Sequence, residues 1–429
     1  KQFYASLDDV SIDALTVKDI ADDIIDQNFM RGLSVDFSAP IVASENYAEC
    51  YDLAAVVSKR NSYLKDSAVK QFKDITSDTD VEYLSRAKSM QSTGDKIIKH
   101  VKSGKTINSI AGANSLVADG IGTRAIFKSL DGDTAICALK NAEITDDELN
   151  TLKTIWRKSD WSGLGESESV LLDKANSVLA EAQTKSLVDK LSNAIKNNEI
   201  SMTEIENYAG KGGIPYFSER QIKQLYDAWL NSADAKAGME LKIKTRFTSN
   251  GDLAKELGFT KEYIDNVNNK VSKPSGYTAC QCNFKYKNGA LGEGQFRGLD
   301  VQDFAEYEHL PYDITQNKST VVNMAKRLEK EGKIDVAKQL GDFESSIKKL
   351  KNTGTSYNDY YNPYLSEIYA YLRKKELGII DIIGENSLET PSLNIPFFST
   401  AENELLSKEC LAKLSRGILY EFKNSSSAA

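Results

Sequence analysis

Apolar residues recur every three or four positions through most of the chain, the spacing that places them on one face of an α-helix. The pattern predicts helices in residues 1 to about 80, for example in VKDIADDIIDQNF and ENYAECYDLAAVVSKR, and again in 81–102. It returns in 143–235, where TDDELNTLKTIW opens with Thr and an acidic first turn, and from 301 to about 375. Helices are therefore expected to dominate the chain.

Strict alternation of apolar and polar residues is confined to shorter segments, and it predicts strands. TRAIFKSL has the pattern of a strand followed by a turn at 131–133, and MELKIKTRF has the pattern of another strand. Residues 277–297 alternate most clearly, and K-N-G at 287–289 supplies an Asn-Gly hairpin turn between two strands. Cys280 and Cys282 share one face of the first of these strands and are expected to pack in the core. We predict an α+β fold with a mixed β-sheet flanked by helices.

Composition and charge narrow the classes of function. The chain has 429 residues, of which 27% are charged and 41% are hydrophobic, as in a globular protein of two or three domains. The formal net charge of -8 argues against a general nucleic-acid binder, so the faintly helix-turn-helix segment DLAKELGFTKEYIDN is not expected to bind DNA. The only histidines, His100 and His309, exclude a His-rich metal site.

Neither a membrane-spanning segment nor a signal peptide is expected from this sequence. No apolar run approaches the roughly 20 residues of a membrane-spanning helix, so no membrane partner is expected. The first residues do not have the pattern of a signal peptide, so none is expected there. We expect a cytoplasmic protein, or one that acts in the cytoplasm of a target cell after delivery.

Two segments carry chemistry suited to a nucleoside triphosphate. Lys88, Ser92 and Lys96 are spaced four apart, so on a helix they would share one face. Two ammonium groups and a hydroxyl on one face suit a triphosphate, although an ordinary solvated basic face is the simpler interpretation. Asp119 precedes a Gly-containing turn into a strand, where its carboxylate is suited to Mg²⁺ and Arg124 to a phosphate or a base.

Two further segments suit a second substrate. In K-P-S-G-Y, at 273–277, Pro stiffens a loop that presents Tyr277, which would either stack on a nucleobase or pack in the core. In E-G-Q-F-R, the side chains of Glu293, Gln295 and Arg297 point the same way on a strand. Three polar side chains on one face of a central strand require partners or a polar cleft, and a carboxylate there can serve as a metal ligand or a general base.

In this order, these segments resemble the synthetase domain of the RelA/SpoT family, which has a nucleotidyltransferase-like fold and moves pyrophosphate from ATP to the 3′ hydroxyl of a guanine nucleotide. The family's R-x-K-S motif, with Ser and Lys following, is matched by Arg86, Lys88, Ser89, Ser92 and Lys96. Its D-x-x-G-x-R and K-P-x-G-Y motifs are matched by Asp119, Gly122, Arg124, Lys273, Pro274, Gly276 and Tyr277. Its E-x-Q-x-R and A-E-x-E-H motifs are matched by Glu293, Gln295, Arg297, Ala305, Glu306, Glu308 and His309.

The resemblance covers about residues 80–320 and is interrupted by a long insertion between the second and third motifs. The domain organisation expected from it is a helical N-terminal region at 1–80, a synthetase domain at 81–142 and 236–320, a helical insertion at 143–235 and a mainly helical C-terminal region at 321–429.

The resemblance also implies a role for each matched residue, with Mg²⁺ as the cofactor. Asp119 and Glu293 would bind Mg²⁺ and act as the catalytic residues, and Glu293 would also take the proton of the acceptor hydroxyl. ATP would be held by Arg86 and Arg124 at the adenine and by Lys88, Ser92 and Lys96 at the phosphates. The acceptor would be held by Lys273, Ser275, Tyr277, Gln281, Gln295 and Arg297.

Two departures from the family affect the acceptor side. The usual Asn of K-P-N-G-Y is Ser275, and the usual R-S-x-H that follows the Tyr is T-A-C-Q, which ends at Gln281. Since the family residues at these positions help to hold the acceptor nucleotide, the identity of the acceptor stays open. Some toxins of the superfamily modify adenine nucleotides or the 3′ end of tRNA instead.

Three functions therefore remain. The first is a toxin or effector pyrophosphokinase that uses an adenine or guanine nucleotide or tRNA as acceptor. The second is a synthetase of the alarmone (p)ppGpp that uses GDP or GTP. The third is a related nucleotidyltransferase, or an inactive fold kept as a binding or structural module. The helical flanks would suit an immunity or antitoxin protein, a delivery system or a second subunit.

Overall fold

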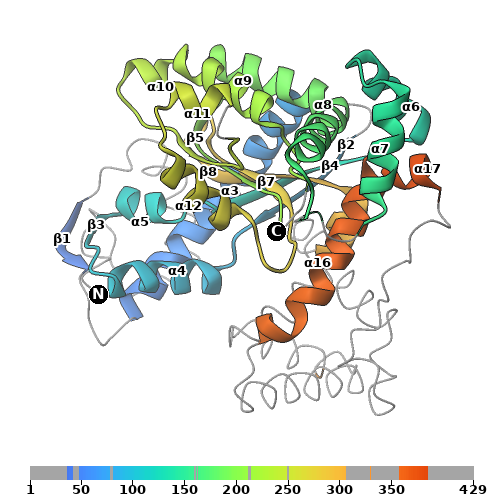
Figure 1. Ribbon diagram of the computed structural model, residues 1–429. Helices are drawn as coiled ribbons and strands as arrows, with labels where there is room; N and C mark the ends of the chain where they lie inside the picture. Colours follow the sequence, from blue (N-terminus) through green and yellow to red (C-terminus); the bar gives the residue numbers. More distant parts are fainter. Residues whose placement is uncertain are drawn as a thin grey trace.

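The computed structural model describes the residues 36–41, 48–77, 81–158, 161, 163–210, 214–248, 251–305, 329 and 357–384 (Figure 1). The helices expected in 1–35, and Glu306, Glu308 and His309 of the last motif, lie outside the described residues.

The centre of the fold is a mixed, open sheet of six strands in the order β2-β4-β8-β7-β5-β6. β4 is parallel to β8 and β5 is parallel to β6, whereas the other neighbours are antiparallel. The strands are β2 (Val81–Ala87), β4 (Ile121–Phe127), β5 (Ser201–Tyr208), β6 (Lys242–Lys244), β7 (Ala279–Lys285) and β8 (Leu291–Gly298). A separate pair is formed by β1 (Asp36–Ile41) and β3 (Ile107–Ser109). The chain is thus an α+β protein with a mixed sheet flanked by helices, as the alternation of its polar residues predicts.

Helices account for most of the remaining described residues (Figure 1). A helix also begins at residue 299, directly after β8. The labelled helices are α3 (Ala48–Thr76), α4 (Met90–Lys102), α5 (Ile110–Leu116), α6 (Gly132–Asn141), α7 (Asp146–Trp156), α8 (Glu166–Lys196), α9 (Glu219–Leu230), α10 (Ala233–Lys236), α11 (Asp252–Glu256), α12 (Lys261–Val271), α16 (Tyr357–Glu376) and α17 (Ile379–Ile383).

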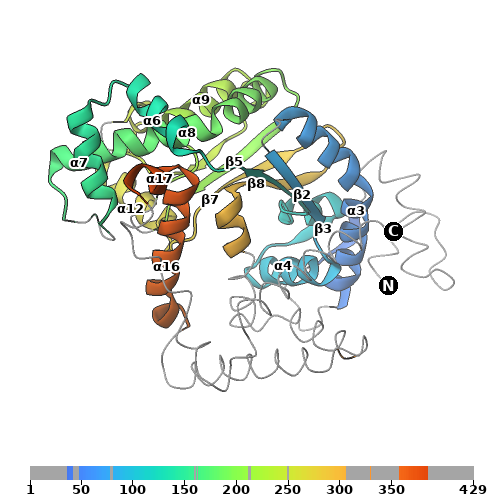
Figure 2. The same cartoon turned by 90° about the vertical axis from the view of Figure 1, so that its right-hand side faces the viewer.

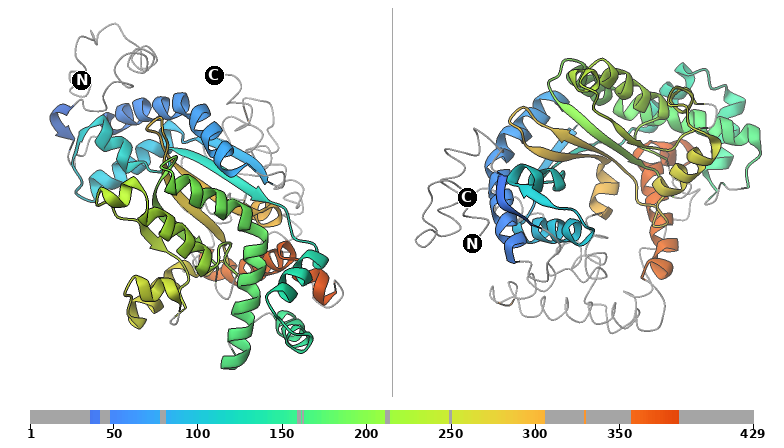
Figure 3. Two further views of the ribbon diagram at one scale, coloured as in Figure 1. Left: turned by 90° about the horizontal axis from the view of Figure 1, so that it is seen from above. Right: turned by 90° about the vertical axis from the view of Figure 1, so that its left-hand side faces the viewer.

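One face of the sheet forms the main hydrophobic core. Phe72 of α3 lies with its ring centroid 5.9 Å from that of Phe296 of β8, and side chains of α8 and α9 belong to the same buried cluster. Cys280 and Cys282 are fully buried on this face, as expected for packing residues. Figure 3 shows α3, α8 and α9 along this side of the sheet. Burial of this face fixes which side chains must point the other way, because strand residues alternate between faces.

The opposite face of the sheet is polar across its width. Strand register places Arg86 beside Gly122, Gly122 beside Glu293, Glu293 beside Asn283 and Asn283 beside Glu204. Residues paired in register project on the same face, so these side chains form one row over five strands. Figure 2 shows α8 and α9 on one side of the sheet and α4 and α16 on the other. The polar row therefore lies on the side of the sheet that α4 and α16 flank.

Helix α16 is anchored by a buried ionic cluster. Arg373 and Glu376 have 1% and 0% of their side chains exposed, and Arg373 Nη1 lies 3.1 Å from Glu376 Oε2. Glu376 also accepts from the Tyr216 hydroxyl at 2.7 Å and from the Val301 backbone N–H at 2.9 Å. The Arg373 guanidinium lies 3.9 Å from the centre of the Tyr216 ring. A buried carboxylate with three partners ties a late helix to the end of β8 and to the segment before α9.

The hairpin predicted within 277–297 is confirmed. β7 and β8 pair antiparallel, from Cys280 with Phe296 to Lys285 with Leu291. Gly289 has φ 78°, a left-handed conformation that glycine adopts without steric cost, so the Asn-Gly turn forms as the sequence indicates. The strands expected in TRAIFKSL and MELKIKTRF correspond to β4 and to the short β6.

The helix predicted across 81–102 is wrong in its first part. Residues 81–87 form the edge strand β2, which pairs with β4 over its full length. Ser89 then begins α4, because its Oγ accepts from the backbone N–H of Ser92 at 3.2 Å. Arg86 therefore lies on a strand and Lys88 precedes the helix. Of the three residues expected on one helix face, only Ser92 and Lys96 belong to α4.

Two other regions differ from the expected helices. The range 143–235 contains α7, α8 and α9 as predicted, but it also contains β5, which pairs with both β7 and β6 inside the main sheet. β1 interrupts the expected helical region before residue 80. The turn expected at 131–133 is the start of α6, where Asp131 Oδ1 accepts from the Thr134 N–H at 2.7 Å.

Candidate functional site

Asp119 lies in the turn before β4 and binds two lysines from separate elements. Lys88 Nζ lies 2.8 Å from Asp119 Oδ2, and Lys96 Nζ lies 2.6 Å from Asp119 Oδ1. The backbone holds Lys88 in place, since its N–H donates to Gly120 O at 2.8 Å and its carbonyl accepts from Ser58 Oγ at 2.9 Å. The structure thus brings together three of the residues predicted from the sequence, although 31 and 23 positions separate the two lysines from Asp119.

The two ion pairs control the protonation of Asp119. Partial burial acts to raise the pKa of its carboxyl, but the charges of Lys88 and Lys96 and their hydrogen bonds outweigh it and lower the pKa to about 2. Asp119 is therefore ionised throughout the physiological pH range. Ser92 sits beside this cluster on α4, where its hydroxyl accepts from Ser89 Oγ at 3.1 Å.

A hydrogen-bonded chain follows the polar face of β8. Gln295 donates from Nε2 to Glu293 Oε1, and its Oε1 accepts from Arg297 Nη2 at 2.5 Å. The same Oε1 accepts from Arg124 Nε at 2.9 Å, across from β4. The prediction that Glu293, Gln295 and Arg297 share one face of a strand is confirmed. Their mutual bonds satisfy polar groups on a face that is only partly exposed.

Arg86 lies on the same face at the edge of the sheet. A Cβ at Gly122 would lie 3.4 Å from Arg86 Cγ, so the arginine stem packs over the glycine of the neighbouring strand. Arg86 pairs in register with Gly122, and Arg124 lies two residues further along β4. The two arginines predicted to flank a base therefore project from the same face of adjacent strands.

The loop 273–277 lies near the C-terminal end of β8, beside Arg297. Arg297 lies 5.4 Å from the centre of the Tyr277 ring, and Gln281 Nε2 donates to the Tyr277 hydroxyl at 3.3 Å. Ser275 Oγ accepts from the Tyr277 N–H at 3.3 Å, so this serine shapes the loop itself. Lys273 contacts a neighbouring ring, with its Nζ 4.3 Å from the centre of a ring contributed by β5. The residues predicted for an acceptor thus form a second cluster around a half-buried tyrosine.

That ring belongs to Tyr208, one of several polar-face residues that the sequence analysis did not identify. Its centroid lies 6.1 Å from that of Tyr277, and its hydroxyl donates to Glu206. Burial and the Glu206 charge raise the pKa of Tyr208 far above its ordinary value. Nearby, Glu204 accepts from Lys244 Nζ at 2.7 Å. The alternating sequence S-M-T-E-I-E-N-Y at 201–208 was the available signal for these residues.

Asp119 and Glu293 supply the kind of donor that Mg²⁺ prefers, carboxylate oxygen. Glu293 lies on the polar face of β8, and Asp119 lies in the turn before the adjoining strand β4. Within the described part of the chain, no three or more His, Cys, Asp and Glu side chains are grouped as ligands for a metal ion. If Mg²⁺ bound at Asp119 and Glu293, it would have to take its other ligands from substrate phosphates and water, as Mg²⁺ commonly does.

Comparison with known proteins identifies no similar protein. No protein-family model, no curated protein and no solved structure matches the chain. Among the described helices, none combines the length and the apolar character that crossing a membrane requires.

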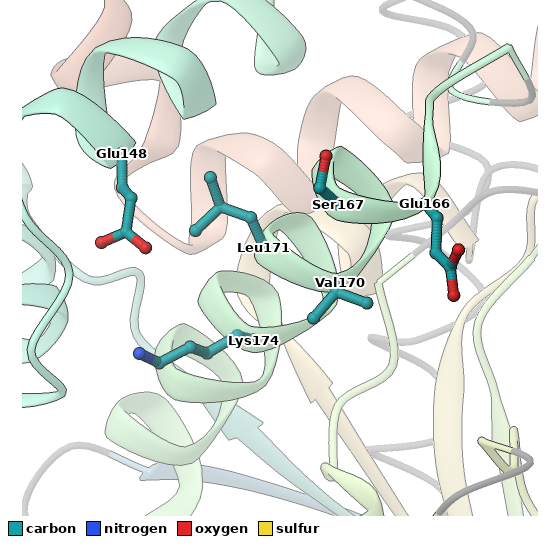
Figure 4. A pocket seen from close by; sticks show the side chains of 6 residues that line it. All are labelled: Glu148, Glu166, Ser167, Val170, Leu171 and Lys174. Carbon is teal, nitrogen blue, oxygen red and sulfur yellow. The ribbon is translucent and has the colours of Figure 1, made fainter.

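A separate hollow lies between the first turns of α7 and α8, and Figure 4 shows its lining. It is open to solvent and has a volume of about 630 Å³. Glu148, on its wall, completes the capping box of α7 by accepting from the Thr145 N–H at 2.8 Å. Hydrogen bonds from Thr145 lower the pKa of Glu148. The carboxylate therefore serves the helix end, and none of the described residues predicted for the functional site lines this hollow.

Proposed function

We propose that the chain is an ATP-dependent pyrophosphokinase, which moves pyrophosphate from ATP to the 3′ hydroxyl of a nucleotide or tRNA acceptor. The observation that carries this proposal is the convergence of distant motifs on one polar sheet face. Arg86, Arg124, Glu293, Gln295 and Arg297 project from that face on the adjacent strands β2, β4 and β8. Scattered basic and polar residues with only structural roles would not be expected to gather in this way.

The two ends of β8 suit different substrates. Toward its start lie Glu293 and, just before the neighbouring strand, Asp119 with its two lysines. This end is rich in ammonium and carboxylate groups and suits a polyphosphate with a divalent cation. Toward its end lies Arg297 beside Tyr277, an arrangement that suits a base and an acceptor phosphate. Gln295 lies between the two ends.

Each group then has a role in a phosphoryl-type transfer. Lys88 and Lys96 hold the ATP phosphates, and Arg86 and Arg124 flank its adenine. Glu293 takes the proton of the acceptor 3′ hydroxyl, whose oxygen forms a bond to the β-phosphorus of ATP. The bond from that phosphorus to the oxygen bridging to the α-phosphorus breaks, and AMP leaves. Mg²⁺, bound at the two carboxylates, would neutralise charge on the phosphates.

The altered acceptor segment favours a toxin or effector over a housekeeping synthetase. Gln281 stands where the family has His, and it is hydrogen-bonded to Tyr277. Synthesis of (p)ppGpp remains the alternative, and strict dependence on GDP or GTP would identify it. A nucleotidyltransferase-like fold kept for binding is the third possibility.

The test measures AMP release from ATP and Mg²⁺ with GDP, GTP, ADP, AMP or bulk tRNA added in turn. We expect AMP with one acceptor, and a loss of at least a hundredfold in Glu293→Gln. Glu262→Gln, an exposed residue of α12, is the matched control and should retain full activity. Absence of AMP with every acceptor, or full activity in Glu293→Gln, would contradict the proposal.

A further inference from the structure

The ion pairs of Asp119 occupy both of its carboxylate oxygens. Lys88 takes Oδ2 and Lys96 takes Oδ1, at 2.8 and 2.6 Å. The side chains of Lys88, Lys96 and Asp119 are 18%, 32% and 27% exposed, so solutes can reach the cluster. Each carboxylate oxygen of Asp119 is therefore already paired with an ammonium group.

In the proposed function, Lys88, Lys96 and Asp119 bind other partners than one another. It assigns Lys88 and Lys96 to the phosphates of ATP, and Asp119 to a divalent cation. The cluster carries two positive charges and one negative charge, so its net charge is unfavourable to a free cation and favourable to an anion. A divalent cation on its own would also have to displace two ammonium groups from the one carboxylate. A polyphosphate, in contrast, offers those ammonium groups several oxygens in exchange.

We infer that Asp119 exchanges partners when a polyphosphate binds: the phosphates take Lys88 and Lys96, and the freed carboxylate then binds the divalent cation that accompanies them. This inference rests on the proposed function, because it concerns the same site. It assigns a binding order to the site, in which a polyphosphate is required before Asp119 can act as a metal ligand.

The local structure allows this exchange through side-chain rotation alone. The Lys88 backbone is fixed by its bonds to Gly120 and Ser58, and Lys96 lies within the regular helix α4. Each ammonium group ends a stem of four carbons, so it can move by several ångströms while its backbone stays in place. No element of the fold has to shift.

Partner exchange makes polyphosphate and cation binding mutually dependent. Each ligand raises the affinity of the other by the same factor, because the coupling free energy is reciprocal. Typical couplings correspond to roughly 5-fold to 150-fold changes in affinity. A purely structural pair of salt bridges predicts no such dependence.

The first experiment titrates a non-hydrolysable ATP analogue into wild type and Asp119→Asn, in EDTA and then in Mg²⁺, by calorimetry. Removing the Asp119 charge frees both lysines, so we expect Asp119→Asn to bind the metal-free analogue roughly tenfold tighter than wild type. In Mg²⁺ we expect it to bind more weakly than wild type, because the cation has lost its ligand. A loss of affinity under both conditions would overturn the exchange.

The second experiment measures Mn²⁺ binding by electron paramagnetic resonance with no nucleotide present. We expect wild type to bind Mn²⁺ weakly, and Lys88→Met/Lys96→Met to bind one ion at least tenfold tighter. Adding Asp119→Asn to that variant should abolish the gain. Lys196→Met, an exposed lysine at the end of α8, is the matched control and should behave as wild type. Equally tight Mn²⁺ binding by wild type and the double variant would overturn the exchange.

Failure of this inference differs from failure of the proposed function. If AMP is released but Asp119→Asn weakens the metal-free analogue, the transfer stands and the exchange does not. The opposite result would be that no acceptor yields AMP, while Asp119→Asn binds the ATP analogue more tightly than wild type in EDTA and more weakly in Mg²⁺. The exchange would then stand without the transfer. Thermal unfolding of each variant identifies any that has lost its fold, and the Asp119→Asn titration does not depend on the lysine variants.

Discussion

Gln295 Oε1 accepts a hydrogen bond from Arg124 Nε at 2.9 Å, which links β8 to β4 on the polar face. The same oxygen accepts from Arg297, while the amide nitrogen donates to Glu293. One carboxamide thus orients two arginines and a carboxylate that belong to opposite ends of the proposed site. Only an amide can do this, since a carboxylate would lack the donor that faces Glu293.

Substitution of Gln295 should mainly reduce activity, whereas substitution of its neighbour Phe296 should mainly reduce stability. Gln295→Leu removes the linking carboxamide and takes one hydrogen-bond partner from the buried Arg297, so we expect pyrophosphate transfer to fall by at least tenfold and stability to fall by about 1–3 kcal/mol. Phe296→Ala removes a fully buried ring from the core and should cost about 3–5 kcal/mol in the free energy of unfolding. Urea unfolding and AMP release measured together check both. A loss of stability in Gln295→Leu as large as that in Phe296→Ala would contradict the assignment of Gln295 to the polar face and Phe296 to the core.

Gly120 should be intolerant of a side chain because of Asn61. A Cβ at Gly120 would lie 2.9 Å from Asn61 Cγ and closer still to its Nδ2. Asn61 is fully buried, so it has little room to move. We expect Gly120→Ala to destabilise the fold by about 1–3 kcal/mol through this overlap.

A double-mutant cycle tests that cause. Asn61→Ala removes the overlapping atoms, so Gly120→Ala should cost at least about 1 kcal/mol less in that background. Additive effects of the two substitutions would mean that the strain of Gly120→Ala arises elsewhere.

The buried cluster under α16 should depend on its charge balance. Arg373→Met leaves the Glu376 carboxyl buried without its cation, and we expect a loss of about 3–5 kcal/mol in the free energy of unfolding. Glu367→Gln, an exposed position on the same helix, is the control and should change stability by less than about 0.5 kcal/mol. Denaturant unfolding of the three proteins measures the difference. Equal stabilities would show that α16 does not depend on this cluster.

Asp119 should make the fold sensitive to acid. Folding lowers the pKa of its carboxyl from 3.8 to about 2, so the folded state binds this proton less tightly than the unfolded state. The stabilisation from Asp119 is then present above about pH 4 and is lost as the pH falls toward 2. The free energy of unfolding of wild type, relative to Asp119→Asn, should decrease over that window. A difference that stays constant from about pH 6 to about pH 2.5 would contradict the prediction.

The spacing of apolar and polar residues predicts the structure correctly in segments whose structure depends mainly on their own sequence. The β7–β8 hairpin follows from alternation around an Asn-Gly turn, and α7 follows from Thr145 and the acidic residues after it. The common face of Glu293, Gln295 and Arg297 follows from the same period of two.

Local patterns failed where pairing with distant residues decides the structure. In 81–87, apolar residues at 81, 84 and 87 have the spacing of a helix, but the segment pairs with β4. In 201–208, a short strand between long helices pairs with β7, which lies more than seventy residues further along the chain. The contact of Asp119 with Lys88 and Lys96 likewise depends on how β2, β4 and α4 meet. Spacing along the sequence does not reveal that arrangement.

The position of β5 between β7 and β6 bears on how this chain can be shortened. A deletion variant that joined residue 142 directly to residue 236 would lose an interior strand along with the helices of that segment. The deletion would leave β6 without a neighbour and would expose the hydrogen-bonding edge of β7 to other molecules. The segment 143–235 therefore contributes an interior strand to the sheet. Its deletion should cause aggregation, whereas deletion of a separately folded module would leave a smaller folded protein.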